Sequence, residues 1–257
     1  MLVVGLHGGV RGAVLAWTLA HFLTALFSLI ATRGIWLPLP LLRLLDLFNV
    51  ELARLALTMG AVQVVNLISY RIELFVLDRY RGIGRVGVYS IAVQTGEMLW
   101  LVAGAIAASV TAPILQESEQ QAASLIARSA LKSFVYTAAI AVVVGAAAPF
   151  LIPALLGHAF SGAARPLAFL LPGIVVYAPV TILVVYLSVR RGRPRLSLAV
   201  SIVGMIVTLA AALALIPRHG ATGAAIASSL GYLAGAALAW TFLARLARGS
   251  IVRATHP

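Results

Sequence analysis

The sequence predicts an all-α membrane protein, a polytopic bundle of about seven transmembrane helices, and three observations support this. Of 257 residues, 62% are hydrophobic and 10% are charged, whereas soluble domains carry about 25% charged residues. The mean hydropathy is +1.04. Apolar runs long enough to cross a bilayer, which takes about 20 residues, recur between short segments rich in Gly, Pro and Arg.

Composition also excludes several kinds of site. The chain has no cysteine, so disulfides, thiolate metal sites and cysteine nucleophiles are excluded. The net charge of +12 comes almost entirely from arginine, because Lys132 is the only lysine. The arginines lie in short loops between apolar runs, where they indicate topology and face anionic lipid headgroups rather than nucleic acid. We expect membrane lipids as partners, and no nucleic acid, cofactor or metal.

The first apolar segment predicts a transmembrane helix over about residues 12–31. Trp17, His21, Thr24 and Ser28 would share one face of it. For His21, a buried histidine bonded to a neighbouring helix is preferred over a proton relay. Residues 33–52 contain two prolines and predict a linker with a short interfacial helix.

The second span, over about residues 53–77, carries a polar stripe. At 100° per residue, Gln63, Asn66, Tyr70 and Glu73 fall within an arc of about 80°. Such a stripe is expected to face other helices or a cavity. A glycine-containing turn at 78–85 leads to a third span over about residues 86–112.

Three charged residues lie inside or against these spans: Arg71, Glu73 and Glu97. A charge at the centre of a membrane helix costs roughly 2.5–3.5 kcal/mol on insertion scales, so each needs a partner or a wet pathway. Arg71 lies about 160° from Glu73 on a helix, so these two cannot pair within it. If the helices fold back near Gly82, Glu97 lies near mid-membrane opposite Asn66.

The remaining spans are expected over about residues 131–150, 166–189, 196–216 and 221–243. Prolines supply the expected helix ends and kinks: Pro113, Pro149 and Pro153 as ends, and Pro172 and Pro179 as kinks. The segment 116–121 is interpreted as a solvated loop. The last span is rich in Gly and Ala, which lets neighbouring helices approach closely.

Arginine and lysine are distributed unequally between the two ends of these spans. One side receives twelve: Arg33, Arg43, Arg54, Arg128, Lys132, Arg190, Arg191, Arg193, Arg195, Arg245, Arg248 and Arg253. The other receives six: Arg11, Arg79, Arg81, Arg85, Arg165 and Arg218. The positive-inside rule predicts that the first side and the C-terminus are cytoplasmic.

Five short motifs resemble a known family. YRIE at 70–73 and GVYSIA at 87–92 resemble the RID…VGxYSxA pattern of bacterial Wzx-type polysaccharide flippases, in the multidrug/oligosaccharidyl-lipid/polysaccharide exporter superfamily. LLGHAF at 155–160, RGRPR at 191–195 and IPRHGATGAAIAS at 216–228 resemble later motifs of that family, in the same order. The resemblance covers roughly residues 53–245.

The resemblance implies one lobe of a two-lobe transporter. Residues 1–32 would be the last helix of a first lobe, 33–52 a cytoplasmic linker, 53–245 a six-helix C-terminal lobe and 246–257 a cytoplasmic tail. Family members have twelve to fourteen helices, so the chain resembles a fragment or one piece of a split transporter. A missing first-lobe chain or self-association would then complete it. The chain also has Glu73 where the family usually has Asp.

The implied function is translocation of undecaprenyl-pyrophosphate-linked oligosaccharide across the bacterial inner membrane, coupled to H⁺ or Na⁺. Arg71 would meet the pyrophosphate through charge-assisted hydrogen bonds, and Glu97 would carry the coupling proton. The other residues of the expected path are Glu73, Asn66, Gln63, Tyr70 and His21.

Other functions and roles remain open from the sequence. Arg71 and one glutamate could form a purely structural ion pair. A drug/cation antiporter of the same superfamily would share the fold, and a non-transporting partner or structural fragment would share the spans. An enzyme is not expected, because no loop is long enough for metal or nucleotide chemistry.

Overall fold

The computed structural model describes residues 9–36 and 50–254, and every element within these ranges is helical. Six of its helical segments are long and apolar enough to cross a membrane. The predicted all-α membrane bundle is therefore confirmed. The chain divides into two compact units, residues 1–54 and 55–257, which we describe separately.

The first unit contains α1 (Gly9–Ala31) and α2 (Arg33–Trp36). The apolar window of α1, Val14–Ala31, is 18 residues long, and none of it is buried. It matches the first predicted span. The interfacial helix expected within 33–52 lies largely outside the described residues.

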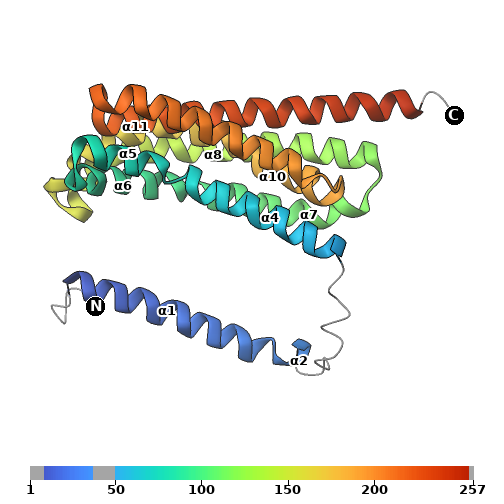
Figure 1. The fold of residues 1–257 in the computed structure, drawn as a ribbon, viewed down its shortest axis with the longest axis horizontal. Coiled ribbons are helices and arrows are strands. Elements are labelled where there is room, and N and C mark those ends of the chain that lie inside the picture. The colour runs from blue at the N-terminus through green and yellow to red at the C-terminus, as the bar shows by residue number, and fades with distance from the viewer. Residues whose placement is uncertain (1–8, 37–49, 255–257) are drawn as a thin grey trace. The chain divides into compact units, whose positions relative to one another are not determined.

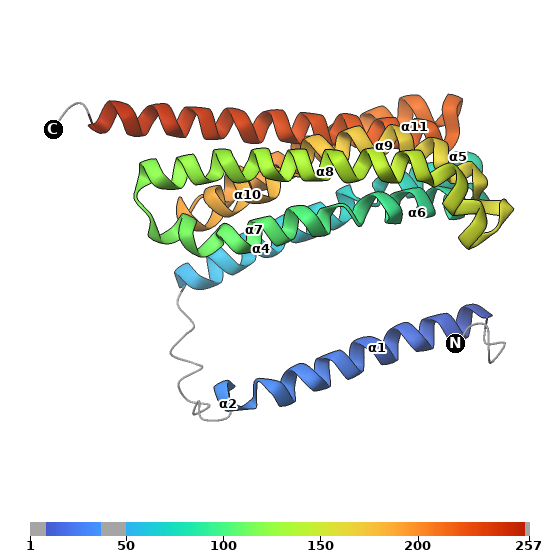
Figure 2. The same ribbon diagram turned by 180° about the vertical axis from the view of Figure 1, so that it is seen from behind.

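The second unit is built from helices that are frequently interrupted (Figures 1 and 2). In chain order the elements are α4 (Val50–Ser69, which begins in the first unit), α5 (Ile72–Arg81), α6 (Ile83–Glu97), α7 (Trp100–Gln116), α8 (Glu119–Leu156), the 3₁₀ helix η1 (His158–Ala163), α9 (Ala164–Tyr177), α10 (Val180–Val185), the π-helix η2 (Tyr186–Arg190) and α11 (Pro194–Ala254).

The last element, α11, is two helices joined at a reversal. Gly220 has φ 56° and ψ −132°, which is not helical and which side chains other than glycine rarely adopt. The chain folds back there, as the change from orange to red in Figure 1 shows. A Cβ on Gly231 would lie 2.7 Å from the carbonyl oxygen of Gly204, so 194–219 and 221–254 pack closely. These halves correspond to the predicted sixth and seventh spans.

Prolines end fewer helices than the sequence suggests. Pro113 lies inside α7, and Pro149 and Pro153 lie inside α8, so the expectation that they end their helices is wrong. At about 1.5 Å per residue the 38 residues of α8 are roughly 57 Å long, and this helix runs the length of the bundle in Figure 2. It ends at Gly157, where φ is 95°. A residue with positive φ terminates a helix more sharply than a proline that loses only one backbone hydrogen bond.

The centre of the bundle is the segment containing α9 and α10. Of its apolar window 56% is buried, against 28% or less in the other candidate spans. Leu167, Leu170 and Ile174 of α9 are fully or almost fully buried, and α9 contacts α6, α8 and α11. Large apolar side chains on the surrounding helices are exposed, which is typical of surfaces that face lipid.

Small residues bring α9 and α11 together. Ser229 of α11 donates a hydrogen bond from Oγ to the carbonyl oxygen of Phe169, at 2.7 Å. A Cβ on Gly173 would lie 2.5 Å from Cα of Ser229, which is backbone and cannot move aside cheaply. The expected close approach of the Gly- and Ala-rich last span is therefore confirmed.

We predict that Gly173→Ala lowers the free energy of unfolding by about 1–3 kcal/mol, because the added methyl group forces two central helices apart. Thermal unfolding of the purified protein in detergent measures this. Gly104→Ala in α7 is the matched control: nothing lies within 4 Å of the added Cβ, and alanine should stabilise the helix by about 0.5–1 kcal/mol. Equal effects of the two substitutions would contradict the close packing.

Candidate functional site

An ion pair joins the two helical segments that follow one another at the start of the second unit. Nη2 of Arg71 lies 3.0 Å from Oε2 of Glu97 and donates a hydrogen bond to it. The two side chains are 38% and 21% exposed, so the pair is partly shielded. The partner that the sequence required for Arg71 is therefore Glu97.

Arg71 and Glu97 both lie at helix interruptions. Residues 70–71 separate α4 from α5, and residues 98–99 separate α6 from α7. A third interruption, at 178–179, separates α9 from α10. At each point the backbone partly changes to tighter hydrogen bonds, from N–H of residue i to C=O of residue i−3, as from Arg71 to Ile68 and from Leu99 to Gly96. Of these breaks, the sequence predicts only the kink at Pro179.

Aromatic rings mark the level at which these interruptions meet. Tyr70, Trp100 and Tyr177 each come from one of the three interruptions, and Tyr232 comes from α11. The centroids of Tyr70 and Trp100 are 4.9 Å apart, and those of Tyr177 and Tyr232 are 5.3 Å apart. We call these four residues the aromatic cluster. It brings the three broken helices and α11 to one place in the bundle.

Glu73 lies two residues beyond the first interruption, in the first turn of α5, and is 1% exposed. Its carboxyl group lies beside the hydroxyl groups of Tyr89 and Ser228, which are 3.5 Å from each other. Its Oε2 has no hydrogen-bond partner among the described residues. A buried carboxyl oxygen without a donor is unusual and marks a position where a proton or a cation could bind.

Of the remaining residues of the predicted path, Tyr70 is the one that belongs to the aromatic cluster. The break at residues 70–71 divides the polar stripe, so that Gln63 is exposed and Asn66 and Tyr70 are half-buried while Glu73 is buried. These residues therefore do not lie on one uninterrupted helix, and the cavity that the stripe is expected to face stays a prediction. In α1, His21 is exposed, and its Nδ1 lies 2.9 Å from the carbonyl oxygen of Trp17 in the same helix. Within the first unit, its contact is with its own helix.

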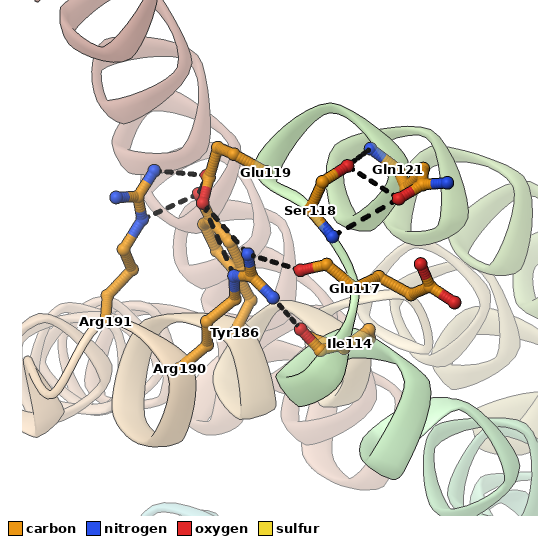
Figure 3. Close-up of polar contacts among 8 residues, drawn as sticks. All are labelled: Ile114, Glu117, Ser118, Glu119, Gln121, Tyr186, Arg190 and Arg191. Carbon is orange, nitrogen blue, oxygen red and sulfur yellow. Dashed lines mark hydrogen bonds and ion pairs between the residues drawn. The ribbon is translucent and has the colours of Figure 1, made fainter.

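Glu119 is a residue that the sequence interpretation missed. It was placed in a solvated loop, but it begins α8 and pairs with Arg190 and Arg191 after the fifth span (Figure 3). Nη2 of Arg190 lies 3.2 Å from Oε2 of Glu119. The hydroxyl group of Tyr186 donates to Oε1 of Glu119 at 2.7 Å. The sequence gives no local signal for this pairing, because Glu119 lies 71 and 72 residues from the two arginines.

Arg190 also binds the end of α7. Arg190 donates from Nη2 to the carbonyl oxygen of Glu117 at 3.0 Å and from Nη1 to that of Ile114. Ser118 and Gln121 form a capping box at the start of α8, also visible in Figure 3. Arg190 thus joins the α7–α8 connection to the end of the central segment.

We predict that Arg190→Ala lowers the free energy of unfolding by about 1–2 kcal/mol, because it leaves two carbonyl oxygens and Oε2 of Glu119 without their donor. Chemical unfolding in detergent, followed by circular dichroism, tests this. Arg193→Ala is the control, because Arg193 is exposed and its side chain makes no hydrogen bond among the described residues. Its effect should stay within about 0.5 kcal/mol. A loss as large as that of Arg190→Ala would contradict the role given to Arg190.

No protein-family model, curated protein or solved structure matches the chain. The resemblance to polysaccharide flippases therefore stays a prediction that rests on the five sequence motifs.

Proposed function

We propose that the chain is part of a transporter that moves a lipid-linked oligosaccharide across the bacterial inner membrane, with Arg71 and Glu97 in the transport path. The observation that carries the proposal is the Arg71–Glu97 pair at the level where three helices of an apolar bundle are interrupted. Broken helices and ionisable side chains at the middle of a membrane bundle are typical of transporter binding sites.

Arg71 has the chemistry to bind a pyrophosphate group. The contact with Glu97 uses Nη2, and the side chain is 38% exposed, so other N–H groups remain available. A guanidinium group binds phosphate oxygens through two parallel hydrogen bonds. The undecaprenyl pyrophosphate expected from the sequence resemblance presents such oxygens.

Competition between Glu97 and a pyrophosphate group for Arg71 would couple transport of the cargo to movement of an ion. A pyrophosphate group that binds Arg71 would displace the carboxylate of Glu97 from its 3.0 Å contact. The released carboxylate would then take up a proton or Na⁺ from the path. Return of Glu97 to Arg71 would release both the ion and the cargo, so that neither moves alone.

Orientation and partner are part of the same proposal. The excess of arginine on one side supports a cytoplasmic position for the end of the bundle that contains Arg190 and Glu119. Alternating access requires two lobes around a shared site. The second unit provides one bundle, so a first-lobe chain or a second copy would supply the facing wall.

A cation exporter of the same superfamily is the second candidate, and Glu73 is the observation that favours it. The carboxyl group of Glu73 is buried and has one unpaired oxygen. Tyr232 of the aromatic cluster is close enough to interact with it electrostatically. Carboxylates and aromatic faces together bind organic cations.

The test uses a bacterial strain that lacks its own flippase and expresses this chain together with a first-lobe chain. Surface polysaccharide should return with the wild-type chain and fall at least about tenfold with Arg71→Ala or Glu97→Gln, while protein levels stay above about half. Gln94→Ala, an exposed position one turn before Glu97, is the control and should behave as wild type.

Three results would count against the proposal. Loss of the protein from the membrane in either variant would show that the ion pair is structural. Restored polysaccharide in both variants would remove Arg71 and Glu97 from the path. Failure of every wild-type pair, combined with export of ethidium, would favour the cation exporter.

A further inference from the structure

Four arginines surround a cavity of about 340 Å³ at the end of the bundle opposite Arg190 and Glu119. They are Arg81, Arg85, Arg165 and Arg218, and we call this cavity the arginine pocket. We propose that the arginine pocket binds a phosphate group, either of a lipid headgroup or of a soluble phosphate compound. This inference does not depend on the proposed transport function.

Three chain reversals bring the four arginines together. Arg81 and Arg85 flank the turn at Gly82, where φ is 78°. Arg165 follows η1, and Arg218 precedes the reversal at Gly220. Nη2 of Arg81 donates to the carbonyl oxygen of Pro217 at 2.5 Å, which joins the first reversal to the third. The pocket is therefore built by the fold rather than by one flexible loop.

The positive charge of the pocket is not balanced by an acidic side chain in its own lining. None of its lining residues is acidic, and His219 adds a further basic side chain. Among the described residues the ion pairs use Glu97 and Glu119, which are not part of the pocket lining. Among the described residues, the side chain of Arg81 donates a hydrogen bond to a neutral carbonyl oxygen, which leaves the charge of Arg81 in place. Convergent like charges repel one another unless an anion binds between them.

Helix N-termini point to an anion at the same place. α6 begins directly after Gly82, and it has no side chain that caps its first turn and no acidic residue in that turn. The second half of α11 begins after Gly220, and Ala221 and Thr222 line the pocket. Free backbone N–H groups and the helix dipole both favour a phosphate group there.

Topology signalling does not explain this arrangement. Arginines that only orient a membrane protein need not converge, and they accumulate on the side with more positive charge. By the sequence count, the arginine pocket contains four of the six basic residues on the side with fewer. These four arginines thus lie together on the side where the positive-inside rule predicts few basic residues.

The surroundings make a lipid headgroup one source of the phosphate. The pocket lies at the ends of helices that are apolar enough to cross a membrane, where headgroups are found. Tyr80 and Ile83, which lie within two residues of Arg81 in the sequence, are 51% and 75% exposed. An acyl chain could lie along these side chains while its phosphate enters the pocket.

Two binding measurements on the full chain in uncharged detergent test the proposal and separate the sources. Isothermal titration uses inorganic pyrophosphate as the soluble probe. Native mass spectrometry compares phosphatidylglycerol with zwitterionic phosphatidylcholine. The test variant is Arg85→Gln/Arg165→Gln, because these side chains are exposed and make no hydrogen bond among the described residues. The control, Arg193→Gln/Arg195→Gln, removes two exposed charges near the opposite end.

We expect at least one probe to bind the wild-type protein, with affinity at least about tenfold weaker in the test variant and unchanged in the control. Binding of phosphatidylglycerol alone would identify a headgroup site, and binding of pyrophosphate alone a site for soluble phosphate. Thermal unfolding should show both variants folded. Equal losses in the two variants, or no binding of either probe to the folded wild type, would overturn the proposal.

Discussion

The hydrogen bonding of the backbone inside a membrane is the constraint on which this structure depends. Within the bilayer core each N–H and C=O group must find a partner in the protein, so an interrupted helix is tolerated only where protein or a wet cavity surrounds the break. The second unit has three such interruptions, and Tyr70, Trp100 and Tyr177 place them together. The aromatic cluster and the Arg71–Glu97 pair occupy this level. Polar chemistry and broken backbone are thus concentrated in one part of an otherwise apolar bundle.

The arginines at the two ends of the bundle differ in whether an acidic side chain pairs with them. Near Glu119, one carboxylate binds both Arg190 and Arg191, and the arginines also hold neighbouring chain segments. Around Gly220, four arginines meet without an acid in the pocket lining. The first arrangement is complete within the protein and stabilises it. The second has no acidic side chain in its lining, and this is the reason that we propose it as a site for a phosphate group.

The sequence predicts the apolar spans and several turns well, because their signals are local. Runs of about 20 apolar residues set the helices, and glycine with positive φ sets the reversals at Gly82 and Gly220. Proline is a weaker guide: Pro179 lies at a break, whereas Pro149 and Pro153 remain within α8. The breaks at 70–71 and 98–99 contain neither residue. They arise from tertiary packing, which no local pattern encodes.

The candidate site is only partly predictable for the same reason. The cost of a membrane charge singles out Arg71, Glu73 and Glu97 in the sequence, but it cannot decide which glutamate Arg71 meets. Helical spacing also suggested a continuous stripe from Gln63 to Glu73, and the break at Tyr70 divides it. The role of Glu119 and the convergence of Arg81 with Arg218 depend on contacts between segments far apart in the chain.

A double-mutant cycle on Arg71 and Glu97 tests the central claim most directly, namely that these two charges hold each other at the helix interruptions. Arg71→Gln, Glu97→Gln and the double variant would be compared with the wild type by chemical unfolding in detergent. If the 3.0 Å pair is present in the folded protein, the double variant should lose less than the sum of the single losses, with a coupling of at least about 0.5 kcal/mol. Single losses that add within about 0.3 kcal/mol would contradict the account.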